Sequence, residues 1–560
     1  MAKTSAKDTL LSNSQRREYG VRVRESNITA CCIVADAVRS TLGPNGMDKL
    51  LIHKTHDITG NFIVTNDGAT ILEEMKLEHP AAKMVAEISQ EQNEKLGDGT
   101  TTSTAFAGAL LKNAVELLED GVHPSTIASG YHQGAQRTAE RLDELAFEVS
   151  LTDTGALQAV AETAMTGRVG DTPDKKIPRL IVRGLIQTKD DKIDSENLQV
   201  LSAKGGSIGD SELTSGLLLD KNVPSKNMPK KISDPKVAVI DGSISFDKGQ
   251  YKRHWVNRPK DMTATVDTPE EANAFIEWKH EVAKNQIQKY LDVGVDAIFP
   301  VGYIDNKQLY YLSTEGILGI RQVDPLDLRR VAAATDARIV GEVDEITEED
   351  LGSVDCIREV KVGSDHRILI ENESNPRSVT LLLRASTEHT LSELERTTKD
   401  VIRVVCKVFN DNRVVTGAGA TEMELARNLR RYAKSINTKE QLVIEAYADA
   451  LEMLPQTLAR NAGCNTIDTL VRLRNMHDAG NRSVGILADG SVADAKEAGI
   501  VEPLQIKKVI VEGATEVATQ LLRVDGIIAT EPLNQEEEDE YVERVEKGEE
   551  PEEALENVRS

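Results

Sequence analysis

Aromatic side chains are scarce in this sequence. Phenylalanine, tyrosine and tryptophan together make up 3% of its 560 residues, and only two of these are tryptophan. Protein interiors are close-packed, so some other set of side chains must fill the space. We therefore expect cores built from aliphatic residues and from close contacts between helices.

Cysteine is also rare, and its spacing argues against two kinds of site. The chain holds five cysteines, an odd number, and no Cys-x-x-Cys pair occurs. We therefore expect neither a disulfide framework nor a zinc site built on paired cysteines, and a reducing compartment fits. The five are Cys31, Cys32, Cys356, Cys406 and Cys464.

Long apolar runs and an excess of basic residues are both missing. No stretch of about 18 apolar residues occurs and the N-terminus is polar through Arg17, so we expect no membrane span and no secretory signal. The formal net charge is −25, which gives no general field to attract nucleic acid or an anionic membrane. We expect a cytoplasmic protein with neither as a partner, whose acidity serves solubility.

Several motifs of known chemistry are absent as well. The sequence contains no phosphate-binding G-x-x-x-x-G-K-[ST], no H-E-x-x-H and no kinase H-R-D set, and its ten histidines show no metal-ligand spacing. A soluble metabolic enzyme with its site in the middle of the chain is therefore a weakly supported hypothesis.

The pattern of apolar residues divides the chain. A chain of this length exceeds one hydrophobic core, because cores stop growing near about 250–300 residues. Helical periodicity dominates residues 1–150 and 412–530, whereas residues 222–375 alternate short β-type runs with helices, which is typical of a mainly parallel sheet. We expect a helical domain split by an inserted α/β domain, with 151–221 and 376–411 as hinges or as a small third domain. The acidic stretch 531–560 reads as a tail.

Some local elements are expected with definite bounds. Helices are expected at 81–96, 101–120, 125–147, 422–433, 439–462, 466–478 and 506–522, with a short one at 494–498. Strands are expected at 237–240, 297–301, 317–323 and 337–340. Residues 61–72 are interpreted as a strand, a turn at Asn66-Asp67-Gly68, and a return strand.

The strongest local signal for chemistry is Gly97-Asp98-Gly99-Thr100-Thr101-Thr102, between two expected helices. Glycines let the backbone approach a ligand, and a helix N-terminus favours an anion such as phosphate. Asp98 could hold Mg²⁺, which takes oxygen ligands. An ordinary Gly-Asp-Gly turn capped by threonine is the alternative.

Other signals are weaker by themselves. Thr41-Leu42-Gly43-Pro44 could cradle phosphates through backbone amides, although it also suits a plain turn. The segment beginning at Gly417 resembles a dinucleotide fingerprint but fails it, because Glu422 stands where glycine is required. Asp400 is one acidic residue on an expected helix and would ordinarily face solvent.

Together these segments resemble the group II chaperonins, the thermosome family of archaeal type. The resemblance runs from about residue 15 to 530, in family order and near family spacing. The matching strings are 34–39, 41–49, 65–72, 79–84, 97–102, 205–208, 387–389, 393–396, 497–499 and 502–504. Any one motif is modest, whereas the ordered set is highly specific.

The resemblance implies a multidomain α+α/β fold that agrees with the pattern. A mainly helical equatorial ATP-binding domain (1–150 and 412–530) would be split by an inserted intermediate hinge domain (151–221 and 376–411). An α/β apical domain (222–375) would bind unfolded or partly folded proteins and carry a helical protrusion near 246–278 as a lid. Double rings of eight or nine identical or paralogous subunits would enclose the client.

The resemblance also implies roles for individual residues toward ATP and Mg²⁺. Asp98 would lie near the magnesium, and Asp67 and Asp400 would be the catalytic carboxylates that position or activate the attacking water. Arg168 stands where the family has a nucleotide-sensing lysine, and Glu502 matches the ribose contact. The remaining nucleotide contacts would be Thr41, Leu42, Gly43, Pro44, Gly99, Thr100, Thr101, Thr102, Gly417 and Gly419.

This chain departs from the family pattern at several positions. Ala418 replaces the middle glycine of a Gly-Gly-Gly turn, and Arg168 is not geometrically equivalent to lysine. Asn93 stands where the family usually has aspartate, and Ala385-Ser386 replaces a usual Gly-Gly. An alternative therefore remains open, namely a structural subunit of a mixed ring that binds nucleotide but barely hydrolyses it.

Overall fold

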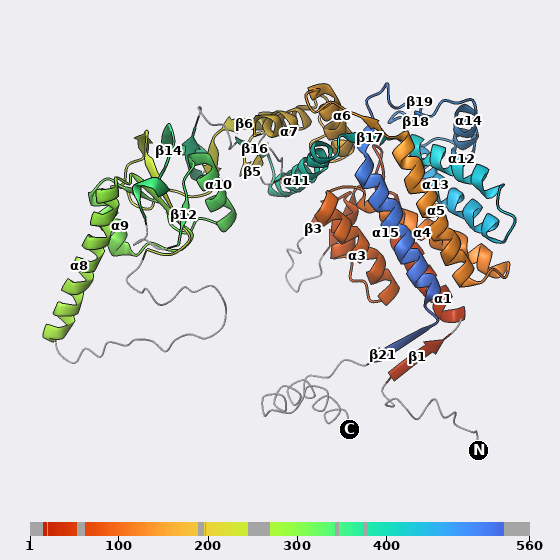
Figure 1. Ribbon diagram of the computed structural model, residues 1–560, viewed down its shortest axis with the longest axis horizontal. Helices are drawn as coiled ribbons and strands as arrows, with labels where there is room; N and C mark the ends of the chain where they lie inside the picture. Colours follow the sequence, from red (N-terminus) through yellow and green to blue (C-terminus); the bar gives the residue numbers. More distant parts are fainter. Residues whose placement is uncertain are drawn as a thin grey trace, which may run out of the picture.

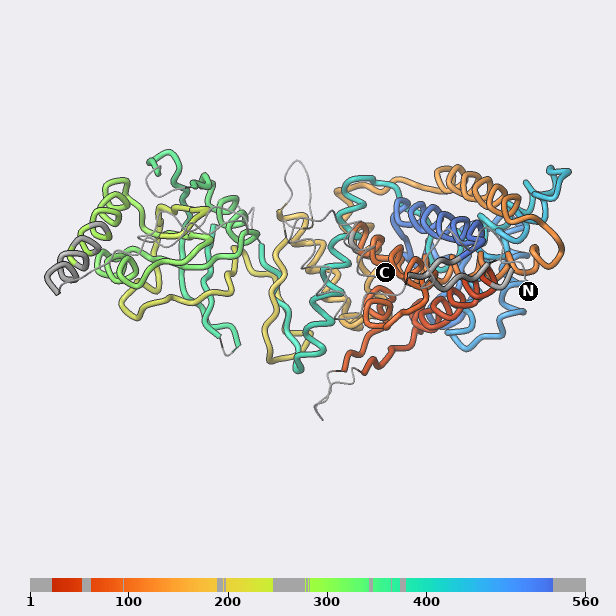
Figure 2. Tube along the Cα trace, turned by 90° about the horizontal axis from the view of Figure 1, so that it is seen from below, coloured from red at the N-terminus to blue at the C-terminus, as the bar shows by residue number. Residues whose placement is uncertain are grey.

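The computed structural model describes residues 15–19, 21–52, 62–188, 195, 198–244, 269–341, 346–363, 365–372 and 379–530. These residues form three parts in a row (Figure 1). We call them the helical body (α1–α5 and α12–α15), the connecting region (α6, α7, α11, β5, β6 and β16) and the α/β body (β7–β15 with α8–α10). Figure 2 shows the same order from a second direction, with the connecting region between the other two.

The helical body unites both ends of the chain in one core. Helices α4 and α5 come from the N-terminal part, and α13 and α15 from the C-terminal part pack against both of them. Strand β1 (Gln15–Tyr19) pairs antiparallel with β21 (Gly526–Thr530). The helices are α1 Val21–Arg39, α2 Gly68–Glu74, α3 Pro80–Leu96, α4 Thr100–Glu119, α5 Pro124–Leu145, α12 Ala420–Ala433, α13 Glu440–Asn461, α14 Thr466–Asp478 and α15 Leu504–Arg523.

Small residues let these helices approach one another closely, as the low aromatic content predicts. A Cβ added at Gly108 of α4 would lie 2.3 Å from the Cβ of Ala35 on α1. A Cβ at Gly130 of α5 would lie 2.5 Å from a methyl carbon of Val443 on α13. Aliphatic packing around these contacts buries the interior of the body.

The α/β body is built on a mainly parallel sheet in the order β11-β10-β9-β12, with β13 antiparallel to β9. Its strands are β9 Lys236–Ile240, β10 Ala297–Pro300, β11 Leu318–Gly319, β12 Ile339–Val340 and β13 Gly352–Ser353, joined by α8 Pro269–Val293, α9 Asn306–Thr314 and α10 Pro325–Thr335. A second, antiparallel sheet has the order β7-β15-β14-β8, with β7 Leu217–Leu219, β8 Lys231–Ser233, β14 Cys356–Val362 and β15 Asp365–Glu371. The predicted multidomain α+α/β fold with an internal parallel sheet is confirmed.

The connecting region holds the outgoing and the returning chain side by side. Strand β5 (Leu198–Lys204) pairs parallel with β16 (Val379–Ala385), and β6 (Glu212–Ser215) pairs antiparallel with β16. Helices α6 (Thr154–Met165) and α7 (Lys176–Gln187) pack on α11 (Glu388–Asn410). Helix α11 leads from the connecting region back to the helical body (Figure 1), and therefore carries its residues to the junction of the two.

Besides the β1–β21 pair, three further small sheets of the described residues border the helical body. Strand β17 (Arg413–Thr416) lies between β4 (Phe147–Glu148) and β20 (Val501–Pro503). Strands β2 (Lys49–Ile52) and β3 (Phe62–Thr65) pair with each other, as do β18 (Val484–Ile486) and β19 (Val492–Asp494).

Two local predictions were wrong. The Asn66-Asp67-Gly68 string does not turn a hairpin, because the Asp67 carboxylate accepts from the amide of Thr70 and so starts helix α2. Residues 494–498 do not form a helix, since Asp494 ends strand β19 and accepts from the next two free amides, at Lys496 and Glu497, in a turn. The strand expected at 317–323 is shorter, Leu318–Gly319.

Two predicted segments fall on residues that the structure does not describe. Most of the protrusion expected near 246–278 lies outside the described residues, which resume at Pro269 with helix α8. The acidic tail 531–560 lies outside them as well.

Candidate functional site

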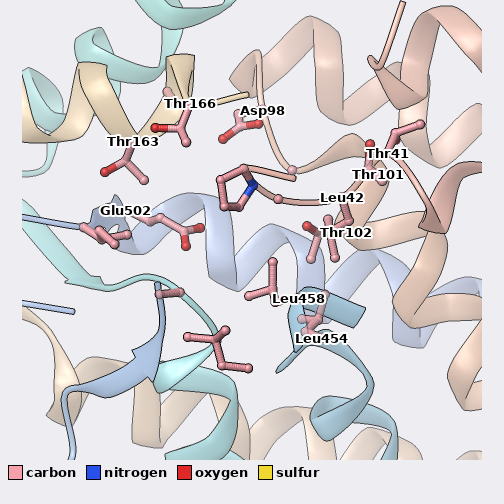
Figure 3. Close-up of a pocket in the computed structure, with 18 of the residues that line it drawn as sticks. Thr41, Leu42, Asp98, Thr101, Thr102, Thr163, Thr166, Leu454, Leu458 and Glu502 are labelled. Carbon is pink, nitrogen blue, oxygen red and sulfur yellow. The ribbon is translucent and has the colours of Figure 1, made fainter. Parts of the chain in front are cut away.

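A deep cavity lies where the connecting region meets the helical body (Figure 3). The residues that line it enclose about 1170 Å³ of space, a volume that includes the part open to solvent. The segments that line it come from α4, α6, α12, α13, α15, β18 and β20 and from the loop after α1. Distant parts of the sequence therefore build one site.

Most of the residues that the sequence analysis nominated line this cavity. These residues are Thr41, Leu42, Gly43, Pro44, Asp98, Gly99, Thr100, Thr101, Thr102, Arg168, Gly419 and Glu502. In Figure 3 Asp98, Thr163 and Thr166 lie along one side, and the two leucines of α13, Leu454 and Leu458, lie along the opposite side. One wall is thus polar and the other apolar.

The Gly97–Thr102 turn is held in place by glycine geometry. Gly97 ends α3 with φ 76°, and a Cβ there would lie 2.8 Å from the backbone oxygen of Asp400. Gly99 is the N-cap of α4 and provides no side-chain cap for the first turn of that helix. The first amides of α4 are therefore left for another acceptor at the cavity, which favours an anion.

A second helix also begins at this cavity. Gly419 is the N-cap of α12 with φ 75°, again without a side-chain cap. The residue before it, Ala418, has φ 57° and lines the cavity. This left-handed conformation is the one that glycine adopts freely and alanine adopts at a cost of roughly 1–2 kcal/mol, so the departure at Ala418 falls at a strained position.

The loop after α1 is fixed by side chains from the C-terminal half. Asn461 donates from Nδ2 to the backbone oxygen of Leu42 at 2.8 Å, and Asn45 donates to the backbone oxygen of Ala488 at 2.7 Å. A Cβ at Gly43 would lie 2.3 Å from a methyl carbon of Leu458. The loop is therefore preformed against α13 and the chain that follows β18.

Three nominated aspartates are joined by two arginines. Arg168 pairs with Asp98 at 2.9 Å and with Asp400 at 3.6 Å. Arg396 pairs with Asp67 at 2.8 Å and with Asp400 at 3.4 Å. Asp98 lines the cavity, whereas Asp67 and Asp400 are 2% and 1% exposed and lie behind it. The structure thus brings the three carboxylates into one charged network.

The two buried aspartates differ electrostatically. For Asp67, burial alone would raise the pKa, but the charges of Arg396 and Arg168 and the hydrogen bonds from Thr70 outweigh burial and hold the pKa below its usual range. For Asp400, burial dominates and raises the pKa to about 7, with the charge of Asp67 adding to the effect. One carboxylate stays ionised and the other can exchange a proton near neutral pH.

The opposite end of the cavity holds Glu502. Its carboxylate points into the cavity (Figure 3), and its backbone belongs to β20, which pairs with β17. The nominated Gly417 does not line the cavity; a Cβ there would lie 2.8 Å from Oε1 of Glu502. Gly417 therefore makes room for that side chain.

Several lining residues were not nominated from the sequence. Thr163 and Thr166 come from the end of α6, and Lys507 comes from the first turn of α15. The others are Asn66, Ala164, Ala418, Glu422, Leu454, Leu458, Ile486, Ala488 and Ile500. Those on helices stand at ordinary amphipathic positions, whose spacing alone carries no signal of a site, and the others lie in β18 or in short connections without a recognisable motif.

The donor set limits what kind of metal site this can be. Among the described residues no group of three or more His, Cys, Asp or Glu side chains is arranged to hold a metal ion. A cation at Asp98 would therefore take most of its ligands from a bound substrate or water, as Mg²⁺ commonly does. Oxygen donors from one carboxylate and a row of threonines fit that cation.

Residues 205–209 match the sequence motif of a hydrolase nucleophile but do not adopt its structure. Gly205–Gly209 reads G-x-S-x-G, but Ser207 opens a 3₁₀ helix and its hydroxyl bonds to Asp210 at 2.9 Å in a capping box. A catalytic serine of this motif stands on a sharp strand-to-helix elbow beside a histidine. Ser207 has a local capping role instead.

The described helices also bear on the membrane question. None of them combines the length with the apolarity that crossing a bilayer requires.

Comparison with known proteins places the sequence among chaperonins. A family model described as the TCP-1/cpn60 chaperonin family matches residues 34–532. Thermosome subunit 1 of Haloferax volcanii is 40% identical over 527 residues, which cover 94% of this chain and 92% of that protein. Thermosome subunit alpha of Halobacterium salinarum is 40% identical over 526 residues (94% and 91%), and the thermosome subunit of Methanopyrus kandleri is 39% identical over 531 residues (94% and 95%).

Proposed function

This chain belongs to the TCP-1/cpn60 chaperonin family, and from that premise we propose that it is an ATP-driven group II chaperone subunit. In this proposal the cavity binds Mg-ATP, and hydrolysis drives the enclosure of unfolded proteins. The observation that carries the proposal is the convergence of Asp67, Asp98 and Asp400 on Arg168 and Arg396 beside the cavity.

The cavity offers matching chemistry to each part of a nucleotide. The uncapped first turn of α4 and the hydroxyls of Thr100, Thr101 and Thr102 suit phosphate oxygens. The apolar wall suits a base, and Glu502 can accept from sugar hydroxyls. The group supplied with the substrate, Mg²⁺, would neutralise phosphate charge, and Asp98 is the side chain that would hold it.

The carboxylates behind the cavity can direct water. Asp67 stays ionised and is fixed by Thr70 and Arg396, so it can orient a water molecule as an acceptor. Asp400, with a pKa of about 7, can take up a proton from that water near neutral pH. Phosphoryl transfer depends mainly on positioning and charge neutralisation. The two carboxylates would supply the positioning of water, whereas Mg²⁺, Arg168 and the first amides of α4 would supply the neutralisation.

The proposed site depends on the position of the connecting region. Thr163, Thr166 and Arg168 reach the cavity from α6 and the turn after it, and Asp400 of α11 pairs with Arg168 from behind the cavity. The other phosphate-side residues belong to the helical body. A hinge movement of the connecting region would therefore complete or dismantle the site, which couples hydrolysis to domain position.

We map the family's domains onto the three parts of the structure. The helical body would correspond to the equatorial domain (1–150 and 412–530) and the connecting region to the intermediate domain (151–221 and 376–411). The α/β body would correspond to the apical domain (222–375), with its strand β7 (Leu217–Leu219) just before that boundary. Identical or paralogous subunits would form a double ring of eight or nine per ring in the cytoplasm, with the protrusion as a lid. Electron microscopy of the purified protein with and without ATP would report ring symmetry and lid closure together.

Mutation of the charged network tests the proposal. We expect Asp98→Ala and Asp400→Ala each to lower Mg²⁺-dependent ATP hydrolysis by roughly 100-fold or more while the subunit stays folded. Asp120→Ala is the matched control, because Asp120 is exposed at the far end of α4. Normal turnover in both site variants would count decisively against the assignment.

A mixed-ring structural subunit that hydrolyses ATP poorly is the alternative suggested by Ala418 and Arg168. The strain at Ala418 is compatible with it, but the complete carboxylate network is not a feature that such a subunit needs. A purified homomeric ring with ordinary turnover would exclude it.

A further inference from the structure

Lys507 lies buried between two glutamates at one end of the cavity. Its Nζ atom is 2.6 Å from Oε1 of Glu422 and 2.7 Å from Oε2 of Glu502. The lysine side chain is 9% exposed, and all three residues line the cavity. They come from three elements, α12, β20 and α15, so the cluster is a tertiary contact.

The charges of this cluster do not balance. One ammonium group faces two carboxylates, and Oε2 of Glu422 is buried without a hydrogen-bond partner among the described residues. Burial raises the pKa of Glu502, which the charge of Lys507 opposes. Buried ion pairs often contribute little net stability, because the desolvation of the charges offsets their attraction. A role in orientation explains the cluster better than a role in stability.

The Glu502 side chain is fixed on two sides. Lys507 holds its Oε2 oxygen, and Gly417 leaves the space that its Oε1 oxygen occupies, 2.8 Å from where a Cβ would stand. The backbone of Glu502 is held in β20 by pairing with Val415 of β17. The carboxylate therefore faces the cavity as a preformed acceptor paired with Lys507, on the side where Figure 3 places Thr163.

We propose that Lys507 is a positioning residue that holds Glu502 as the acceptor of a sugar hydroxyl and so makes this cavity select ribonucleotides over deoxyribonucleotides. The inference rests on the proposed binding of ATP and adds the determinant of sugar selectivity. A hydrogen bond to a charged acceptor separates two ligands by roughly 10-fold or more in Kd. Without Lys507 the Glu502 carboxylate would be protonated more readily and held less firmly, and the difference in Kd between the two nucleotides would be lost.

The experiment measures Kd for ATP, 2′-deoxy-ATP and 3′-deoxy-ATP with Mg²⁺ by titration calorimetry on the full-length protein. We expect the wild-type chain to bind ATP at least about 10-fold more tightly than 2′-deoxy-ATP, and 3′-deoxy-ATP reports the contribution of the other sugar hydroxyl. Lys507→Met should bring that ratio close to one by weakening ATP alone. Lys508→Met is the matched control and should keep the ratio, because Lys508 pairs with Asp143 outside the cavity.

Two more variants keep the test independent of folding. Lys507→Met combined with Glu422→Gln removes one cation and one anion, so the cluster keeps its net charge, and we expect the same loss of selectivity. Glu422→Gln alone leaves Lys507 with Glu502, and we expect selectivity to remain. Thermal unfolding of each variant checks that it is folded.

The outcomes separate this inference from the proposed function. A wild-type chain that binds no ATP overturns the proposed function. A wild-type chain that binds ATP, together with a folded Lys507→Met chain or double variant that keeps the full ratio, overturns the inference alone. A wild-type chain that binds ATP and 2′-deoxy-ATP equally also overturns it.

Discussion

Asp67 combines two tasks that mutation can separate. Its carboxylate accepts from the amide and hydroxyl of Thr70 and so caps helix α2, and it also pairs with Arg396 at 2.8 Å. The capping role alone would account for an aspartate at this position. The pairing with Arg396, which lies on α11, connects the cap to the charged network.

We predict that Asp67→Asn and Asp67→Ala differ in stability but not in activity. Asparagine keeps a capping oxygen, whereas alanine loses it, which costs about 1 kcal/mol more. Both remove the charge, so both should lose most ATP hydrolysis. Urea unfolding followed by circular dichroism measures the first difference and a phosphate-release assay the second. Equal stability of the two variants would contradict the capping role.

The pKa of Asp400 predicts a pH dependence. Folding raises this pKa from 3.8 to about 7, so the proton is held more tightly in the folded state. The associated stability is fully present below about pH 4 and is lost as the pH rises through about 7. ATP hydrolysis should instead increase as the pH rises through about 7, because only the ionised Asp400 carboxylate can accept a proton.

We therefore expect ATP hydrolysis to rise with pH and to reach half its maximum near pH 7. Initial rates between pH 5.5 and 9 at saturating Mg-ATP measure this profile. Asp120→Ala should show the same profile, whereas Asp400→Asn should be nearly inactive at every pH. A wild-type profile that is flat across this range would show that Asp400 is not the proton acceptor.

At the scale of elements, glycine residues set how closely neighbouring helices of the helical body approach one another. Gly108 lets α4 approach α1 so closely that an added Cβ would lie 2.3 Å from that of Ala35. At Gly513 of α15 an added Cβ would lie 3.2 Å from a methyl carbon of Ile88, which can shift. The same substitution should therefore have different consequences at the two sites.

We predict that Gly108→Ala destabilises the protein and that Gly513→Ala does not. Alanine gains up to about 1 kcal/mol of helix propensity at either site. Overpacking at Gly108 costs typically 1–3 kcal/mol, so the net effect there is unfavourable. Differential scanning calorimetry of the two variants gives the comparison. An unchanged transition temperature in Gly108→Ala would mean that α1 and α4 can separate at little cost.

The local spacing of apolar residues predicted the helices and strands well, but it did not predict which distant residues contact one another at the site. The helix expected at 466–478 matches α14, and the four strands expected in the α/β body all exist, because apolar periodicity directly reflects burial. Asp67 and Arg396 are more than three hundred positions apart, and no local pattern links them. Lys507 was missed because a lysine in an amphipathic helix ordinarily faces solvent.

At the scale of the whole molecule, the net charge of −25 predicts a salt dependence. Like charges repel one another in the compact state, and the screening length falls from about 30 Å at 0.01 M salt to about 8 Å at 0.15 M. We expect the unfolding temperature at pH 8 to rise over this range by roughly 1 °C for each kcal/mol of stability gained, because the unfolding entropy of a 560-residue chain is about 1.2 kcal/mol/K. Scanning fluorimetry in NaCl measures it.

The control for this prediction is the same titration near pH 5, the isoelectric point of the sequence. Net repulsion is small there, so added NaCl should change the unfolding temperature little. An equal rise at both pH values would point to a specific ion effect, and a fall at pH 8 would mean that ion pairs outweigh net repulsion.

The split construction of the helical body has a consequence for synthesis on the ribosome. Helices α1 to α5 emerge first, yet α13 and α15, which cover them, lie beyond the whole α/β body in the sequence. Translation at about 5–20 residues per second delays this cover by on the order of half a minute. The α/β body can fold during that interval, whereas the apolar faces of the N-terminal helices that pack against α13 and α15 remain exposed.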